Sequence, residues 1–227
     1  KRQRILRSFM IEDLADNHCA MLVTLTYSPE NVPYIVPYFN ANNTEVILPY
    51  NDDTGRFSSV SINNNDFNKI LNVSKTFVYH NRREFDSKDS ESVASLLGDS
   101  YSSRPNCFLP CFRYSDVQKF LKKLRRFLER EGLDARVRYY CTAEYGSSYY
   151  RPHYHLLLFF ADESARAAVF ERESCALIAY KSRMGQRTSL WTLGLSDWQY
   201  YSGSDGSYLT NYLTCSSDLP SVYRLPP

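Results

Sequence analysis

The chain has 227 residues, of which 43% are hydrophobic. This is enough for one substantial domain with a packed core, and it excludes an intrinsically disordered chain. The formal net charge is only +2, which disfavours a protein that binds nucleic acid through its overall charge, so any such binding has to rely on local patches.

The part of the chain before residue 115 predicts one helix, one strand and a long irregular stretch. Apolar and charged residues alternate at helical spacing over 4–16, which predicts a helix. Residues 19–27 are rich in apolar and β-branched side chains and predict a strand that ends at Ser28. Residues 28–114 show little periodicity beyond a short candidate strand at 45–48, and we expect an insertion of loops and short elements there.

The second half of the chain has clearer patterns. An amphipathic helix is expected over 115–130, with Ser115 and Gln118 as a capping box and Gly132 as the stop signal. Further elements follow in order: strands at 135–144 and 150–160, a helix at 162–179 and a short helix at 207–215. This order predicts an α+β fold with a central antiparallel sheet flanked by helices, in a single domain over 1–227 with 28–114 as its insertion-rich region.

Two histidines, His153 and His155, begin the second of these strands. Side chains two positions apart in a strand point to the same face, so both imidazoles can approach one divalent metal ion. Glu144 ends the preceding strand and can supply an oxygen ligand, which a harder ion would need beside two imidazoles. The alternative is a pair of exposed strand histidines without a ligand.

Two tyrosines, Tyr208 and Tyr212, are spaced to share one face of the expected helix at 207–215. A phenol is a weak nucleophile near neutral pH, because its ordinary pKa is about 10. A metal ion that neutralises charge on a phosphate would help such a nucleophile. The alternative is that both tyrosines only pack in or near the core.

The expected helix at 115–130 also carries many basic residues. They form either a solvated surface or a set of contacts to a DNA backbone, and each contact to a phosphate would make binding more sensitive to salt. Arg151, beside the histidine pair, is open to the same two interpretations. The candidates for DNA binding are Lys122, Lys123, Arg125, Arg126 and Arg151.

Four segments resemble the HUH endonucleases, and within them the replication initiator proteins of microviruses, which are small single-stranded DNA phages. The similarity runs with gaps from about residue 19 to residue 216, and the metal-binding motif is its specific part. The segments are 22–27 (a first motif, in a strand), 116–126 (the basic helix of the phage branch), 143–146 with 151–159 (the metal-binding motif) and 208–214 (the motif of the nucleophile).

The resemblance implies a ferredoxin-like HUH domain whose histidine strand is central in the sheet. It implies that His153, His155 and Glu144 bind Mg²⁺ or Mn²⁺. It also implies that Tyr208 or Tyr212 attacks a DNA phosphate, which leaves a 5′-phosphotyrosine link and a free 3′-OH that primes rolling-circle replication. A second tyrosine can cut the new junction while the first rejoins the old strand.

The resemblance further implies partners and a location. The expected partner is single-stranded DNA at a replication origin, with a host replication helicase or polymerase as further candidates. The expected location is the host bacterial cytoplasm, and six cysteines without a CxxC pair agree with a reducing compartment. No apolar run approaches the roughly 18 residues of a membrane helix, so no membrane partner is expected. One departure from the family is Asn211, where members often carry Lys between the two tyrosines.

Three other functions remain open from the sequence. A relaxase or single-tyrosine transposase of the same superfamily would need only one of the two tyrosines. A non-catalytic module would bind single-stranded DNA without cutting it and would not respond to a chelator. A zinc hydrolase fits less well, because the chain has no HExxH motif.

Overall fold

The computed structural model describes residues 19–49, 57–81, 95, 97–181 and 189–201. The helices expected at 4–16 and 207–215, and with them Tyr208 and Tyr212, lie outside the described residues. The chain divides into two compact units. Among the described residues, the first unit contains 19–27, 114–144, 153–181 and 189–201, and the second contains 28–49, 57–81, 95, 97–113 and 145–152.

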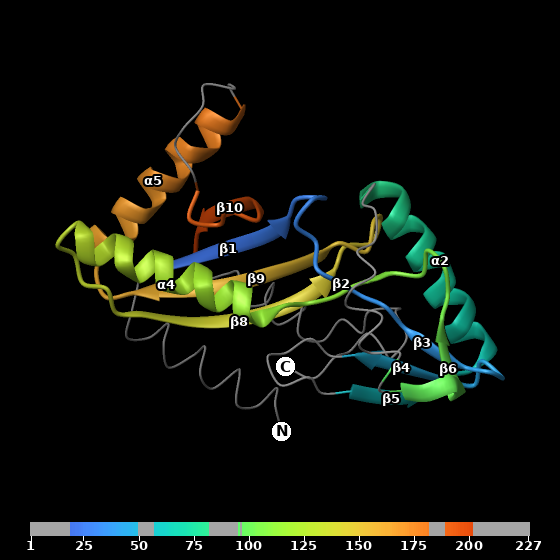
Figure 1. Cartoon of the computed structure of the whole chain (residues 1–227). Coiled ribbons are helices and arrows are strands. Elements are labelled where there is room, and N and C mark those ends of the chain that lie inside the picture. The colour runs from blue at the N-terminus through green and yellow to red at the C-terminus, as the bar shows by residue number, and fades with distance from the viewer. Residues whose placement is uncertain (1–18, 50–56, 82–94, 96, 182–188, 202–227) are drawn as a thin grey trace. The chain divides into compact units, whose positions relative to one another are not determined.

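The first unit is built on one four-stranded sheet. Its strands lie in the order β10-β1-β9-β8, and β1 is antiparallel to both of its neighbours. The elements follow one another as strand, helix, strand, strand, helix, strand, which is the split β-α-β arrangement (Figure 1). They are β1 (Ala20–Tyr27), α4 (Tyr114–Arg130), β8 (Val137–Tyr145), β9 (Pro152–Phe160), α5 (Glu163–Lys181) and β10 (Gly194–Tyr200).

This architecture confirms the expected α+β fold with an antiparallel sheet. The expected strands and helices of this unit up to residue 181 are present in the order expected, with ends shifted by one or two residues. Strand β10 is the element that the sequence interpretation missed. Its burial follows no clean inside–outside alternation, and only a polar loop was expected before 207.

The two faces of this sheet differ in what covers them. On one face, Tyr27 donates a hydrogen bond to Asp116 of α4 at 2.9 Å, and Phe120 of α4 packs on Trp198 of β10 with ring centroids 6.0 Å apart. We call this the helix-covered face. Because strand side chains alternate, the residues between these positions point to the other side, which carries Thr24, Thr26, His153 and His155 and is called the histidine face.

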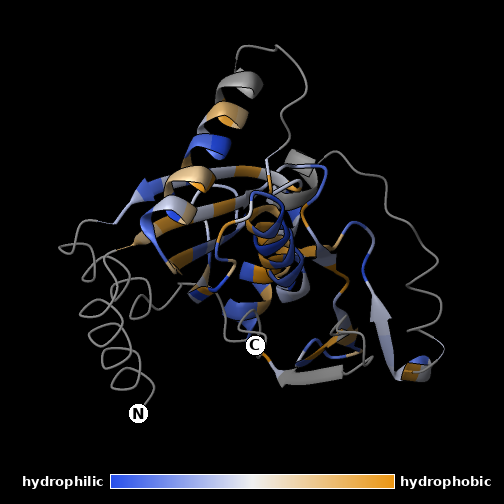
Figure 2. Cartoon of the chain, turned by 90° about the vertical axis from the view of Figure 1, so that its left-hand side faces the viewer, coloured by the Kyte–Doolittle hydropathy of each residue, from blue (hydrophilic) through white to orange (hydrophobic). Residues whose placement is uncertain are grey.

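Helix α4 forms because its apolar residues recur at helical spacing. Its buried residues line one side, and the exposed side is charged, so both orange and blue mark the helices in Figure 2. The helix ends at Gly132, whose φ of 71° is the left-handed conformation that closes a helix. The amide of Leu133 donates to the Leu128 carbonyl at 2.9 Å and that of Gly132 to the Glu129 carbonyl at 3.2 Å. This confirms the predicted stop signal.

Tyr27 supports a first prediction, on stability. Its side chain is fully buried, donates to Asp116 and lies 3.4 Å from the Tyr154 hydroxyl, and burial raises the pKa of Tyr27 so that the phenol stays protonated. Tyr27→Phe would leave the buried Asp116 carboxylate without this donor. We expect it to lower the free energy of unfolding by about 1–3 kcal/mol. Urea unfolding followed by circular dichroism measures this.

The matched control is Tyr114→Phe. Tyr114 shares a hydrogen bond of 2.7 Å with Tyr139, but its side chain is 41% exposed, so water can replace the lost partner. We expect a change within about 0.5 kcal/mol for this variant. Equal losses in the two variants would contradict the role given to the buried Tyr27–Asp116 hydrogen bond.

The second unit corrects the expectation of loops over 28–114. It contains one two-stranded and one four-stranded antiparallel sheet, in the orders β2-β7 and β5-β4-β3-β6, together with a helix of 18 residues. The elements are β2 (Tyr34–Ile35), β3 (Tyr38–Asn40), β4 (Glu45–Pro49), β5 (Phe57–Ser61), α2 (Asn64–Asn81), η1 (Gly98–Ser100), β6 (Tyr101–Ser103) and β7 (Leu109–Pro110).

The second unit also has its own hydrophobic core. Val46 and Leu48 of β4, Ile70 and Val73 of α2 and several neighbours are buried together. The short strand expected at 45–48 is confirmed as β4. Helix α2 was missed although it carries a start signal: Asn63 accepts a hydrogen bond from the amide of Asp66 at 2.9 Å, as an N-cap does. The surrounding Asn and Ser residues obscured that signal.

None of the helices in the described residues has the length and apolar character of a membrane span.

Candidate metal centre and nucleic-acid site

The histidine pair is positioned by the register between β1 and β9. Pro152 begins β9, and the residues that follow alternate between the two faces of the sheet. His153 lies opposite Thr26, and His155 lies opposite Thr24, while Tyr154 between them is buried on the helix-covered face. The structure therefore puts both histidines on one face of a central strand, as their spacing predicted.

Glu144 contacts the second histidine of the pair. Its Oε1 lies 2.9 Å from Nε2 of His155, and the His155 side chain is 6% exposed while that of Glu144 is 31% exposed. Neighbouring ligand atoms of a six-coordinate Mg²⁺, with bonds of about 2.1 Å, lie about 3 Å apart. The spacing of these two atoms and their chemistry, one imidazole nitrogen and one carboxylate oxygen, both fit a shared divalent cation.

The two threonines of β1 are site residues that the sequence interpretation did not identify. Thr24 Oγ1 lies 3.1 Å from Nδ1 of His155, and Thr26 Oγ1 lies 2.9 Å from Nδ1 of His153. Each histidine is therefore held at the same ring nitrogen by a hydroxyl from the adjacent strand. A signal was present in the sequence, because the two threonines have the same spacing of two as the two histidines.

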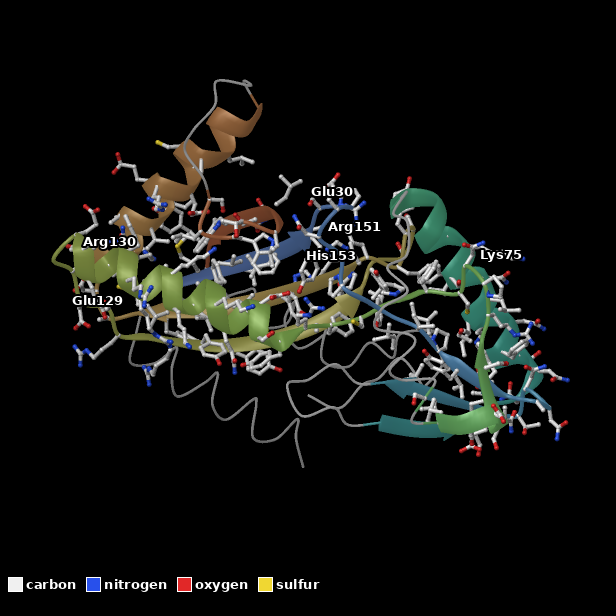
Figure 3. All side chains as sticks on the ribbon, in the orientation of Figure 1. Glu30, Lys75, Glu129, Arg130, Arg151 and His153 are labelled. Atoms are coloured by element: carbon white, nitrogen blue, oxygen red, sulfur yellow. The ribbon has the colours of Figure 1, made fainter. Side chains whose placement is uncertain are left out.

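The third candidate ligand, His153, is not in contact with the other two. Within the described residues, no three His, Cys, Asp or Glu side chains are close enough together to hold a metal ion. His153 lies two residues from His155 on the same strand face, about 6.6 Å along the strand. In Figure 3 it is near the N-terminal end of β9. The structure thus brings Glu144 and His155 together and leaves His153 beside them on the histidine face.

The basic residues of α4 lie on the opposite side of the sheet from the histidines. Lys122, Lys123 and Arg126 are on the outer part of the helix, and Lys123 Nζ donates to Thr192 Oγ1 at 2.9 Å. Arg125 is half-buried and donates from Nη2 to the Val137 carbonyl at 2.8 Å, which ties α4 to the start of β8. Figure 3 shows the end of this helix at Glu129 and Arg130. The sheet itself therefore separates this helix surface from the pair formed by Glu144 and His155.

Arg151 belongs to the second unit. It closes a turn in which the Gly146 amide donates to the Arg151 carbonyl at 3.0 Å, and the Tyr150 amide donates to the Gly146 carbonyl at 3.0 Å. Tyr150 adopts φ of 49°, a left-handed conformation that is uncommon for a bulky residue. The side chain of Arg151 is half-buried, and the prediction that it binds a phosphate stays a prediction.

Comparison with known proteins gives the chain a family. Residues 101–217 match the family model of the replication-associated protein ORF2, and this span is just over half of the 227 residues. The chain belongs to this family. The match covers α4, β8, β9, α5 and β10, and therefore most of the first unit, including Glu144, His153 and His155.

A curated relative supports the same conclusion. The chain is 41% identical over 71 residues to a protein of Spiroplasma virus 4 named "Replication-associated protein ORF2". That match covers 31% of this chain and 19% of the relative, so the chain accounts for about a fifth of the relative's length. No solved structure matches. The resemblance to the replication initiators of small phages is confirmed by both matches.

Proposed function

We propose that this chain is the DNA-nicking domain of a rolling-circle replication initiator of the HUH class. The observation that carries the proposal is the contact between Glu144 and His155 on the histidine face, at the centre of a split β-α-β sheet. Membership of the replication-associated family supports the role in replication. The order of elements and the antiparallel sheet support a ferredoxin-like HUH domain.

His155, Glu144 and His153 are the residues that would hold a divalent metal ion. Mg²⁺ or Mn²⁺ is the proposed ion, because the set mixes imidazole nitrogen with a carboxylate oxygen and contains no thiolate. When bound, such an ion neutralises negative charge on the oxygens of the phosphate that is attacked. The half-buried sheet surface contributes by limiting the access of water, which strengthens electrostatic interactions at the phosphate.

Tyr208 and Tyr212 are the proposed nucleophiles. The phenolic oxygen of one tyrosine attacks the phosphorus of a DNA phosphodiester, and the bond from phosphorus to the 3′ oxygen breaks. The phenol loses its proton, and the departing 3′ oxygen takes one up, so the products are a 5′-phosphotyrosine ester and a free 3′-OH. One phosphodiester replaces another, so the step is reversible and a second attack can rejoin the strand.

The substrate in this proposal is single-stranded DNA at a replication origin, in the host bacterial cytoplasm. A host helicase or polymerase would then use the opened strand and its 3′-OH. Lys122, Lys123, Arg125 and Arg126 are proposed to contact the DNA backbone, and Arg151 is proposed to bind a phosphate near the metal-binding motif. Since α4 covers the face opposite the histidines, its lysines and arginines would contact a stretch of DNA other than the phosphate that is cut.

A charge reversal on α4 tests these backbone contacts. For the double variant Lys122→Glu with Arg126→Glu, we expect the slope of log binding constant against log salt to become shallower by about 1 for each phosphate that the protein no longer binds. Fluorescence anisotropy of a labelled oligonucleotide over a series of salt concentrations measures the slope. Lys75→Glu, an exposed lysine of α2, is the matched control (Figure 3). An unchanged slope in the double variant would remove α4 from the interface.

The proposed function is tested by trapping the covalent intermediate. The full chain is mixed with single-stranded oligonucleotides, including candidate origin sequences, in Mn²⁺ and separately in EDTA, and a protein–DNA adduct that resists denaturant is sought. A Mn²⁺-dependent adduct is the expected result. DNA binding without any adduct across the pool would favour a binding module, and an adduct that persists in EDTA would contradict the role of the metal.

A further inference from the structure

Two threonines face the two histidines across the boundary between β1 and β9. The register pairs Thr24 with His155 and Thr26 with His153, and both hydroxyls are within hydrogen-bond distance of Nδ1 of the facing ring, at 3.1 Å and 2.9 Å. The same contact therefore occurs twice, at neighbouring positions on one sheet face. A chance packing contact would explain one such pair more easily than two in the same register.

The strand that carries these threonines is firmly held. Strand β1 is paired on both sides, with β9 and with β10. The carbonyl of Thr26 accepts a hydrogen bond from Nε1 of Trp191 at 3.0 Å. Trp191 is 2% exposed and packs edge-on against Tyr27 and Tyr154, with ring centroids 5.2 Å and 6.4 Å away. The hydroxyls of Thr24 and Thr26 are thus fixed by a buried aromatic cluster on the other face of the sheet.

A histidine that binds a metal ion must present one unprotonated ring nitrogen, and an oxygen at its other nitrogen fixes both the tautomer and the ring orientation. With Nδ1 held by a threonine, Nε2 is the nitrogen left to coordinate. In His155 this is the atom that lies 2.9 Å from Glu144. A hydroxyl can either accept or donate, so it can serve the ring before and after its proton moves.

We propose that Thr24 and Thr26 are positioning residues of the metal centre, which orient His155 and His153 through Nδ1 and present Nε2 to the cation. The inference rests on the proposed function for the identity of the ligand, although not for the hydrogen bonds themselves. A threonine that only packed in the sheet would be replaced without consequence by valine, which has nearly the same shape and lacks the hydroxyl.

Thr24→Val and Thr26→Val in the full chain test the inference with two readouts. The first is the binding of Mn²⁺ alone, measured by isothermal titration calorimetry, for which we expect each variant to bind about 10- to 100-fold more weakly. The second is the ¹⁵N shifts of the ring nitrogens in the protein without metal. We expect Thr26→Val to change the tautomer populations of His153, and Thr24→Val to change those of His155.

Two further variants make these readouts specific. Thr26→Ser retains a hydroxyl and is expected to restore Mn²⁺ affinity and the His153 signals. Thr76→Val removes a hydroxyl from α2, where it bonds to the Asn72 carbonyl, and is expected to leave both readouts unchanged. Wild-type affinity and unchanged ring signals in the β1 variants would overturn the inference. So would a failure of Thr26→Ser to restore what Thr26→Val loses, because the defect would then lie in packing.

Failure of the proposed function looks different from failure of this inference. If the wild-type chain binds no Mn²⁺ and forms no adduct, the metal-dependent nicking is wrong. The ring signals then still decide whether the threonines control the tautomers. If the wild-type chain binds Mn²⁺ and the β1 variants behave like wild type, the nicking proposal stands and the positioning role falls.

Discussion

Replacing His155 by alanine is expected to lower the rate of covalent adduct formation with single-stranded DNA by about 10²- to 10³-fold, which corresponds to a loss of several kcal/mol of charge stabilisation in the transition state. His155 is buried, contacts Glu144 at 2.9 Å and lies on a strand paired with β1, so its ring is held where the cation would bind. The rate is measured by quenching timed reactions in denaturant and separating the adduct on a gel.

Further variants separate loss of the ligand from loss of the fold. His155→Asn keeps a polar side chain in the buried position and is expected to show a comparable loss of rate with near wild-type thermal stability. Glu144→Gln is expected to be less severe, because water can replace one oxygen ligand. His80→Ala, outside the metal-binding motif, is the matched control. Full-rate adduct formation by a folded His155 variant would show that the metal assignment is wrong.

Replacing the nucleophile is expected to have the larger effect. Tyr208→Phe or Tyr212→Phe should remove at least about 10³-fold of adduct formation if the altered tyrosine is the one that attacks, because phenylalanine has no oxygen to form the ester. Both tyrosines lie outside the described residues, so the order in which they act is left to the measurement. The adduct assay with an oligonucleotide that spans the cut site compares the two single variants and the double variant.

The pattern of results distinguishes the alternatives. If each single variant retains adduct formation and the double variant has none, both tyrosines can attack, as strand cutting and rejoining by an initiator requires. If one single variant is inactive and the other is silent, a single-tyrosine mechanism like that of a relaxase is favoured. An adduct in the double variant would exclude both residues as nucleophiles. Tyr149→Phe, on the exposed turn between β8 and β9, is the matched control.

The sequence by itself determined the strands and helices of the first unit up to residue 181. Their signals are local: apolar spacing along α4, the glycine after it, and the apolar runs of β1 and β9 all act within a few residues. Local spacing also predicted that His153 and His155 would share a face. The resemblance to phage replication initiators came from short motifs, and the family match confirmed it.

Local signals failed where the structure depends on partners far apart in the chain. Strand β10 is an edge strand of mixed burial, and it pairs with β1, which lies at the other end of the described chain, so nothing near it specified its partner. Helix α2 buries Ile70 and Val73 against strands of the second unit, and such burial overrides the weak helix preference of its many asparagines.

The site itself was also divided between the two sources. The residue types and spacing of Glu144, His153 and His155 suggested ligands, whereas only the register of β1 against β9 put Thr24 and Thr26 at the Nδ1 atoms of the histidines. The tertiary structure also decided that the basic residues of α4 and the histidines lie on opposite faces of one sheet. The physical reason is that a sequence records which side chains are near in the chain. Strand register and the packing of a helix on one face decide which side chains meet.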